Sequence, residues 1–261
     1  MRVRLSAILL LLLWSVAAGL IPAQAAPSSV QLLLDEANQY YVTAKDNMAL
    51  QKFEEVLAVD PNCYEALYKA SLLNSHIGNR YSDVISKINY FEKARYYADL
   101  ALCAFPEAAE GSYAMALAIH NKALALNVKE RMASSKVIKF YLDEAVCAKP
   151  DYADAWQLLG RWHFKNANLN LAEKSAVNLF FGGISLDASN EQAVAALETA
   201  IKLNPNNISY YFDLACVYRE MKKDDMSMAM LQDAINLKLL TSDELEISRR
   251  CKAMLEELDR T

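Results

Sequence analysis

Four prolines divide the chain at nearly regular intervals, and they limit what it can fold into more than any other feature. They occur in "VDPN", "AFPE", "AKPD" and "LNPN", at Pro61, Pro106, Pro150 and Pro205, and each follows an amphipathic run with helical periodicity. A proline just past a helix ends that helix and can open the next one. Glycine and proline number only six each in 261 residues, too few for a turn-rich β fold. The chain is therefore predicted to be all-helical and built from repeated units.

The units fit the tetratricopeptide repeat, a pair of antiparallel helices of 34 residues with the preferences W-x2-L-G-x2-Y and then A-x3-F-x2-A. In "KPDYADAWQLLGRWHF", Trp156, Leu159 and Gly160 fall at repeat positions 4, 7 and 8 of a unit that starts at Ala153. A small residue at position 8 lets the paired helices approach each other, and large residues fill the space between neighbouring pairs. We predict an all-α, right-handed α-α superhelix (a tetratricopeptide-like solenoid) of roughly twelve helices.

The units are longer than the standard repeat, because the four prolines are 45, 44 and 55 residues apart (61 to 106 to 150 to 205). Longer helices account for the first two excesses, and "SDVISKINYFEKARYYADLALCA" is predicted as one long helix with Ser82 as its N-cap. The third excess fits an additional helix, "NLNLAEKSAVNLFF", which Gly182-Gly183 would end. Ser189 would then cap the helix that follows.

The first 25 residues have the pattern of a signal peptide. Arg2 and Arg4 precede a mostly apolar run over residues 5–18, and the segment closes with small residues up to Ala25. We predict cleavage after Ala25, which makes the protein periplasmic or secreted. The alternative is an uncleaved leader that anchors the chain in a membrane.

Residues 26–261 are then predicted to form one helical-repeat domain. Its last helix, at about 242–259, would cap the apolar end of the solenoid, with Thr241 and Glu244 as a capping box. The net charge of −5 becomes −7 when the two leader arginines are removed (25 − 32). No nucleic-acid partner is expected, because such binding needs a basic surface. A membrane partner is expected only if the leader stays attached.

The residues that could support chemistry are scattered. The three histidines, His76, His120 and His163, are far apart, and no H-E-x-x-H, G-x-S-x-G or phosphate-loop motif occurs. We therefore predict no enzymatic activity, no metal site and no cofactor. The five cysteines lack a C-x-x-C spacing and their number is odd, so most are predicted to be small buried apolar residues.

One segment is similar to a known family. "LLGRWHFKNANLNLAEKSAVNLFF" resembles the tetratricopeptide-like domain of the regulator of microtubule dynamics proteins, and the similarity extends over roughly residues 60 to 258. The matching positions are Leu158, Leu159, Gly160, Arg161, Trp162, Phe164, Ala167, Leu169, Glu173, Lys174, Leu179 and Phe180. Leu171 stands where the family usually has tryptophan, and Gly182-Gly183 replaces a Pro-Pro. The resemblance implies the fold and a general protein-binding role. It does not imply microtubule binding for an exported chain, which never meets cytoplasmic microtubules.

In this repeat class, first-helix positions 2, 5, 9, 12 and 13 line the concave groove. Projected onto this chain, that family property predicts the partner-binding residues Tyr68, His76, Tyr113, His120, Asn121, Gln157, Arg161, Phe164, Lys165, Phe212 and Arg219. We hypothesise that Arg161 and Lys165 hold an acidic residue or C-terminal carboxylate of a partner. The alternatives are an internal bridge from Arg161 to Glu173 or Asp154, and a tyrosine row that packs between helices.

The predicted function is an exported, non-enzymatic adaptor that binds a protein or peptide partner in its concave groove. Two other classes stay open. One is a structural component that works by oligomerisation, through its convex face or the long helix of the second unit. The other is a small-ligand binder or enzyme that uses the space near the additional helix. The identity of the partner, the oligomeric state and the source compartment are not decided by the residues.

Overall fold

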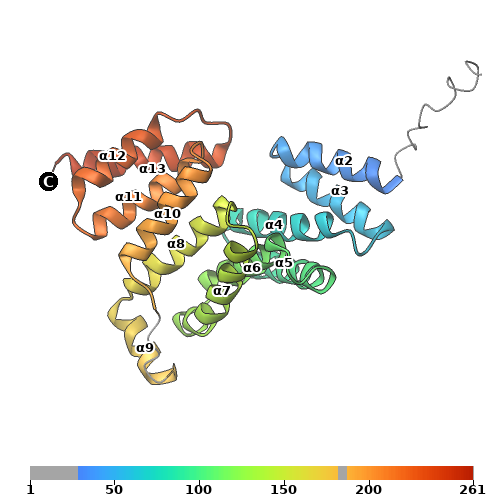
Figure 1. The fold of residues 1–261 in the computed structure, drawn as a ribbon, viewed down its shortest axis with the longest axis horizontal. Helices are drawn as coiled ribbons and strands as arrows, with labels where there is room; N and C mark the ends of the chain where they lie inside the picture. The colour runs from blue at the N-terminus through green and yellow to red at the C-terminus, as the bar shows by residue number, and fades with distance from the viewer. Residues whose placement is uncertain (1–28, 182–186, 261) are drawn as a thin grey trace, which may run out of the picture.

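The computed structural model describes residues 29–181 and 187–260, so the predicted leader and Gly182-Gly183 lie outside the described residues. The described part contains twelve helices and no strand (Figure 1). They are α2 (Ser29–Val42), α3 (Asp46–Val59), α4 (Tyr64–Arg80), α5 (Val84–Ala104), α6 (Ala109–Ala125), α7 (Val128–Ala148), α8 (Ala153–Ala167), α9 (Leu171–Phe181), α10 (Asn190–Leu203), α11 (Ile208–Glu220), α12 (Asp224–Ile235) and α13 (Ser242–Leu258). The predicted all-α repeat fold is confirmed.

The helices pack as five antiparallel pairs, namely α2 with α3, α4 with α5, α6 with α7, α8 with α10, and α11 with α12. Each pair contacts the next, and α13 packs on α11 and α12 at the end of the chain. Figure 1 shows the resulting curved path from α2 and α3 to α11, α12 and α13. The curvature brings distant segments of the chain together. Arg80 at the end of α4 forms an ion pair with Asp243 of α13 at 3.1 Å.

Most of the predicted helix boundaries that fall on described residues agree with the structure. Each of the four prolines lies two residues beyond the end of a helix, after α3, α5, α7 and α10. The Ser189 side chain accepts from the Gln192 N–H at 3.1 Å, and Thr241 forms the predicted capping box. Ser82 is not the N-cap of α5. Asp83 takes that place and accepts from the Ser86 N–H at 2.7 Å, since a carboxylate is the stronger acceptor at a helix N-terminus.

The close contact at Gly160 explains the pairing of α8 with α10. A Cβ atom at this position would lie 2.7 Å from the Leu197 Cγ and 3.2 Å from the Ala193 carbonyl oxygen, both on α10. Gly160, at repeat position 8, thus lets the paired helices approach each other as predicted. The helix paired with α8 is α10, however, and not α9, the next helix along the chain. In the sequence, the additional helix α9 lies between α8 and α10. In space, it packs mainly on α7.

The prediction that most of the cysteines are buried is wrong. All five thiols are free, but only Cys251 is buried. Cys103 and Cys147 are exposed and lie in the last turns of α5 and α7. No helix among the described residues is both long and apolar enough to span a membrane.

Candidate functional site

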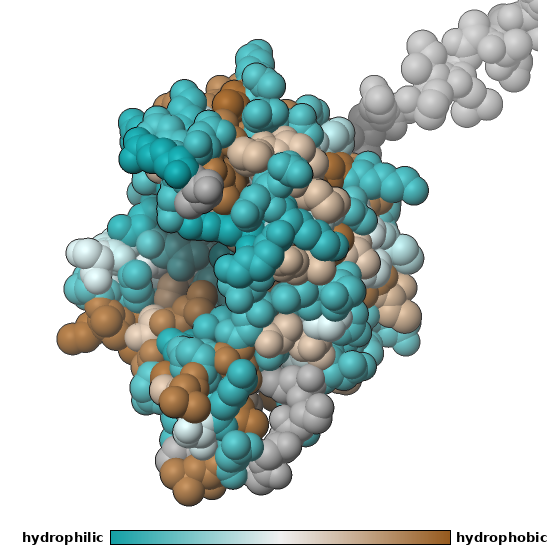
Figure 2. Space-filling view, turned by 90° about the vertical axis from the view of Figure 1, so that its left-hand side faces the viewer, coloured by the Kyte–Doolittle hydropathy of each residue, from teal (hydrophilic) through white to brown (hydrophobic). Residues whose placement is uncertain are grey.

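The concave face carries a cleft of about 230 Å³ between α6, α8, α11 and α13, with one wall from α10. Figure 2 shows a hollow on the face where the C-terminal helices lie, with hydrophilic residues above it and hydrophobic residues below. The lining residues are His120, Leu124, Arg161, Phe164, Lys165, Leu197, Phe212, Asp213, Cys216, Val217 and Arg250. The cleft therefore combines an apolar floor with three cations and a single carboxylate.

Two of these three cations, Arg161 and Arg250, have only weak contacts with other side chains. The Arg161 Nε lies 3.8 Å from Asp213 Oδ2, and its side chain is 49% exposed. The guanidinium of Arg250 stacks over the Phe212 ring at 4.3 Å and forms no ion pair with any described residue. Asp213 itself accepts from the Gln157 Nε2 at 2.6 Å, and burial raises the pKa of this carboxyl. Arg161 and Arg250 are thus available to an anion that enters the cleft.

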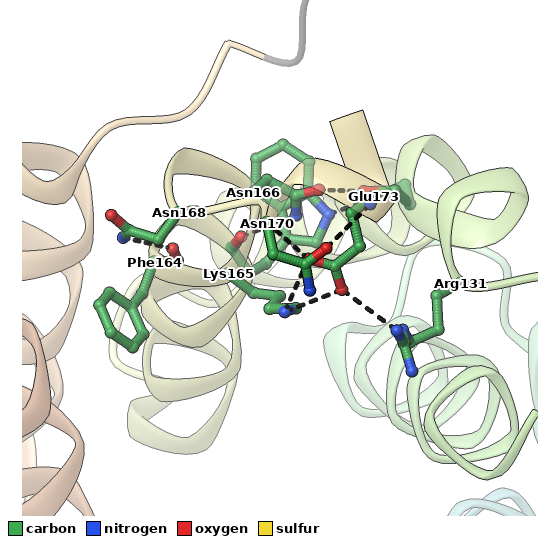
Figure 3. Close-up of polar contacts among 9 residues, drawn as sticks. Arg131, Phe164, Lys165, Asn166, Asn168, Asn170 and Glu173 are labelled. Carbon is green, nitrogen blue, oxygen red and sulfur yellow. Dashed lines mark hydrogen bonds and ion pairs between the residues drawn. The ribbon is translucent and has the colours of Figure 1, made fainter. Parts of the chain in front are cut away.

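The third cation, Lys165, is occupied by a buried carboxylate. Glu173 of α9 lies 2.9 Å from the Lys165 Nζ and 3.1 Å from the Arg131 guanidinium, and only 1% of its side chain is exposed. Figure 3 shows Glu173 between these two cations. It also accepts from the Asn170 N–H at 3.0 Å, while the Asn170 side chain caps the Glu173 N–H. Burial acts to raise the Glu173 pKa, but the Asn170 N–H, Lys165 and Arg131 together lower it, so the group is ionised.

His120 is the histidine among the residues that line the cleft. It is half-buried and lies between the cleft and a smaller cavity of about 40 Å³ that Arg131 and Trp162 also line. Burial, and then the nearby charge of Arg161, lower the pKa of His120 to about 3. The imidazole is therefore neutral at physiological pH and adds no charge to the cleft.

The structure gathers five of the eleven predicted groove residues into the cleft, namely His120, Arg161, Phe164, Lys165 and Phe212. Gln157 lies just behind them and orients Asp213. Tyr113 and Asn121 are 8% and 6% exposed, so they pack between helices and present little surface to a partner.

The other three predicted residues lie elsewhere. Tyr68 is half-buried against the ring of Tyr64. His76 lines a separate cleft near Arg80 and α13, and Arg219 bonds Glu257.

Two parts of the Arg161 hypothesis need correction. Its internal partner is Asp213, not Glu173 or Asp154, because Arg161 projects toward α11. Asp154 instead accepts from the Tyr210 hydroxyl. Lys165 is not free beside Arg161, because Glu173 occupies it.

Arg250 and Asp213 were missed by the sequence reasoning. Arg250 belongs to the terminal helix, which was assigned only a capping role, and Asp213 is at a repeat position not counted as groove-lining. The excess of arginine in "SRRCK" is the one sequence feature that could have drawn attention to α13. Among the described residues, no group of three or more His, Cys, Asp or Glu side chains is arranged to hold a metal ion.

Solved structures similar to this chain are tetratricopeptide-repeat proteins and related bacterial proteins. A thermophilic repeat protein from Thermus thermophilus has a TM-score of 0.60 and 19% identity, over 87% of this chain and 100% of its own. A repeat protein from Parabacteroides merdae has a TM-score of 0.54 and 12% identity, over 85% and 71%. PilF of Pseudomonas aeruginosa has a TM-score of 0.52 and 12% identity, over 88% and 86%. At such low identity these likenesses show the fold alone, which is that of a tetratricopeptide-like helical repeat.

No curated protein sequence matches the chain significantly. The family model described as "Regulator of microtubule dynamics protein 1-3" matches residues 33–259, which is nearly all of the described chain. The match includes α8, which carries Gly160 and Arg161, and α9, which carries Glu173. The chain therefore belongs to the regulator of microtubule dynamics family, represented by proteins 1 to 3.

Proposed function

We propose that this chain is an exported, non-enzymatic helical-repeat protein that binds a protein partner through its concave cleft. One observation carries the proposal: two guanidinium groups lie over an apolar floor, and neither has a close ion pair with a described residue. Arg250 stacks on Phe212 at 4.3 Å, and Arg161 is 3.8 Å from Asp213. Arginine and aromatic side chains together are typical of the residues that contribute most to protein binding.

The chemistry of the cleft indicates what part of the partner it takes. Guanidinium groups bind carboxylates with charge-assisted, often bidentate hydrogen bonds. The floor beside them includes the partly exposed rings of Phe164 and Phe212, which favour an apolar side chain. An acidic residue or a C-terminal carboxylate next to an apolar residue fits both features.

The experiment is an affinity capture from an extract of the producing cells, with the protein from Ala26 onward as bait. The test variant carries Arg161→Glu and Arg250→Glu. The matched control carries Lys93→Glu and Arg95→Glu, the same change of charge at two exposed residues of α5. We expect the wild type and the control to capture the same partner and the test variant to lose it.

The captured partner then allows a quantitative test. Loss of two charge-assisted contacts at roughly 1.5 kcal/mol each predicts a Kd increase of about a hundredfold for the test variant. Equal affinity for wild type and test variant, with both folded by circular dichroism, would place the binding surface outside the cleft. Tubulin and nucleic acid, added as competitors, are expected to have no effect.

The proposed location of the protein is periplasmic or secreted, with the leader removed after Ala25. N-terminal sequencing of the exported protein tests this directly and is expected to begin at Ala26. A membrane-bound chain that keeps residues 1–25 would support the anchored alternative.

A second candidate function, assembly through oligomerisation, is favoured by one observation. The long helix α5 exposes Ile85 to 75%, Tyr96 to 61% and Val84 to 51%, which is unusual for one helix of a repeat. Sedimentation over a wide range of concentration separates the two functions. A mass that grows with concentration, and returns to the monomer in Ile85→Asp, would favour assembly over adaptor binding.

A further inference from the structure

The helix α9 buries a carboxylate where it meets α7 and α8. Helices in globular proteins are held by an apolar face packed on their neighbours. Among the side chains of α9 that the structure describes, Glu173 alone is buried. The apolar residues Leu171 and Leu179 are instead 82% and 77% exposed. Among the described side chains of α9, the Glu173 carboxylate is therefore the one that is buried against α7 and α8.

The anchor uses a pair of cations that would suit any carboxylate. Arg131 comes from α7 and Lys165 from α8, so their positions do not depend on α9. Glu173 lies 3.1 Å from the first and 2.9 Å from the second. Figure 3 shows how its carboxylate faces both cations. The Arg131 Nε is buried and has no hydrogen-bond partner among the described residues, so Glu173 does not use every donor of this guanidinium.

This cation pair adjoins the concave cleft. Lys165, His120 and Leu124 line both the 230 Å³ cleft and the smaller cavity that contains Arg131. A partner segment with one carboxylate at Arg161 and Arg250 could therefore reach the second pair without leaving the concave face. The Lys165 side chain is 46% exposed and Arg131 is 24% exposed, so an incoming group can reach the pair from solvent.

We propose that Arg131 and Lys165 form a second carboxylate-binding site, which Glu173 occupies in the free protein. An acidic segment of the partner takes the place of Glu173 and releases α9 from α7. The internal carboxylate thus competes with the second acidic residue of the partner for this site. The inference rests on the proposed protein-binding role of the concave face, and it adds a selectivity for segments with more than one carboxylate.

Competition of this kind has a measurable consequence. A site that is free only part of the time lowers the apparent affinity by the fraction that is free. Glu173→Gln keeps the size of the side chain and an acceptor for the Asn170 N–H, but it removes the negative charge. Partner carboxylates should therefore bind the variant more tightly than the wild type, whereas a purely structural role for Glu173 predicts equal or weaker binding.

The test uses fluorescein-labelled octaglutamate as the probe and fluorescence anisotropy at low ionic strength, with protein expressed from the full 261-residue chain. We expect Glu173→Gln to bind the probe about tenfold more tightly than the wild type. Glu191→Gln, the same change of charge at an exposed residue of α10, should stay within about twofold of the wild type. Arg131→Gln added to Glu173→Gln should abolish the gain. If Glu173→Gln binds no more tightly than Glu191→Gln, the proposal is wrong.

A second measurement does not depend on how the variants fold. Amide hydrogen exchange of residues 171–181 is followed in the wild type, with octaglutamate or with octalysine. Octaglutamate should accelerate exchange in α9, and octalysine should not. Unchanged exchange in the presence of saturating octaglutamate would overturn the proposed release of α9.

The outcomes separate this inference from the proposed function. If Arg161→Glu with Arg250→Glu abolishes probe binding while Glu173→Gln has no effect, the cleft binds acidic partners but the second site does not exist. If charge reversal at Arg161 and Arg250 has no effect while Glu173→Gln tightens binding, the second site stands and the proposed role of the cleft fails.

Discussion

Replacing Gly160 with alanine should destabilise the contact that positions the cleft. The added Cβ would lie 2.7 Å from the Leu197 Cγ and 3.2 Å from the Ala193 carbonyl oxygen. Favourable carbon contacts begin near 3.5 Å, so α10 would have to retreat by roughly 0.8 Å or Leu197 would have to leave its rotamer. Neither atom is the far end of a flexible side chain, and this makes the clash hard to relieve.

The magnitude follows from two opposing effects. Overpacking of this kind costs about 1–3 kcal/mol, and the two close contacts place Gly160→Ala toward the upper end. The helix propensity of alanine is also more favourable than that of glycine, by about 1 kcal/mol inside a helix. The net loss in the free energy of unfolding is then about 1–2 kcal/mol, which corresponds to a fall in Tm of roughly 2–8 °C for a domain of this size.

Gly111 offers a matched control, because it also lies inside the first helix of a pair. A Cβ there would meet the Leu102 Cδ2 at 3.3 Å and the Tyr64 hydroxyl at 3.6 Å, both at the ends of side chains that can move. Gly111→Ala should therefore be neutral or stabilise by up to about 1 kcal/mol. Thermal and urea unfolding followed by circular dichroism at 222 nm compares the two variants. A Gly160→Ala protein as stable as the wild type, or an equal loss in Gly111→Ala, would refute the packing argument.

Two further predictions concern pH and backbone strain. The pKa of His120 is about 3 in the folded protein against 6.5 in the unfolded chain, so the unfolded state binds the extra proton and stability falls as the pH drops below 6.5. Between pH 7 and pH 5 this residue should lower the free energy of unfolding by about 2 kcal/mol. Urea titrations at the two pH values should show that this loss is missing from His120→Gln. An unchanged pH dependence in the variant would contradict the assignment. Lys222 has a φ of 61°, a left-handed conformation that costs a residue with a side chain about 1–2 kcal/mol. Lys222→Gly should raise the free energy of unfolding by about 0.5–1 kcal/mol, after the entropic cost of glycine is subtracted. Lys222→Ala keeps the strained backbone and should give no gain. A gain in both variants would point to the lysine charge instead.

The sequence by itself was sufficient for the helices and their order. Proline, N-caps and the capping box act within one or two turns, so the signals at Pro61, Ser189 and Thr241 could be interpreted locally. Position 8 of the repeat also predicted the close approach at Gly160, because only a glycine or a small residue fits between paired helices. The one N-cap error, Ser82 for Asp83, is a shift of a single residue between two good capping types.

Only the tertiary structure decided which side chains form the cleft. Arg161, Asp213 and Arg250 come from three helices and meet because the solenoid curves and α13 folds back on α11. The pairing of α8 with α10, across the inserted α9, placed Glu173 on Arg131 and Lys165 instead of leaving Lys165 free. Hydrophobic periodicity identifies the buried face of each helix, but it carries no information about the crossing angles between pairs. Contacts between residues far apart in the chain depend on those angles, so the binding site emerges only when the whole solenoid is assembled.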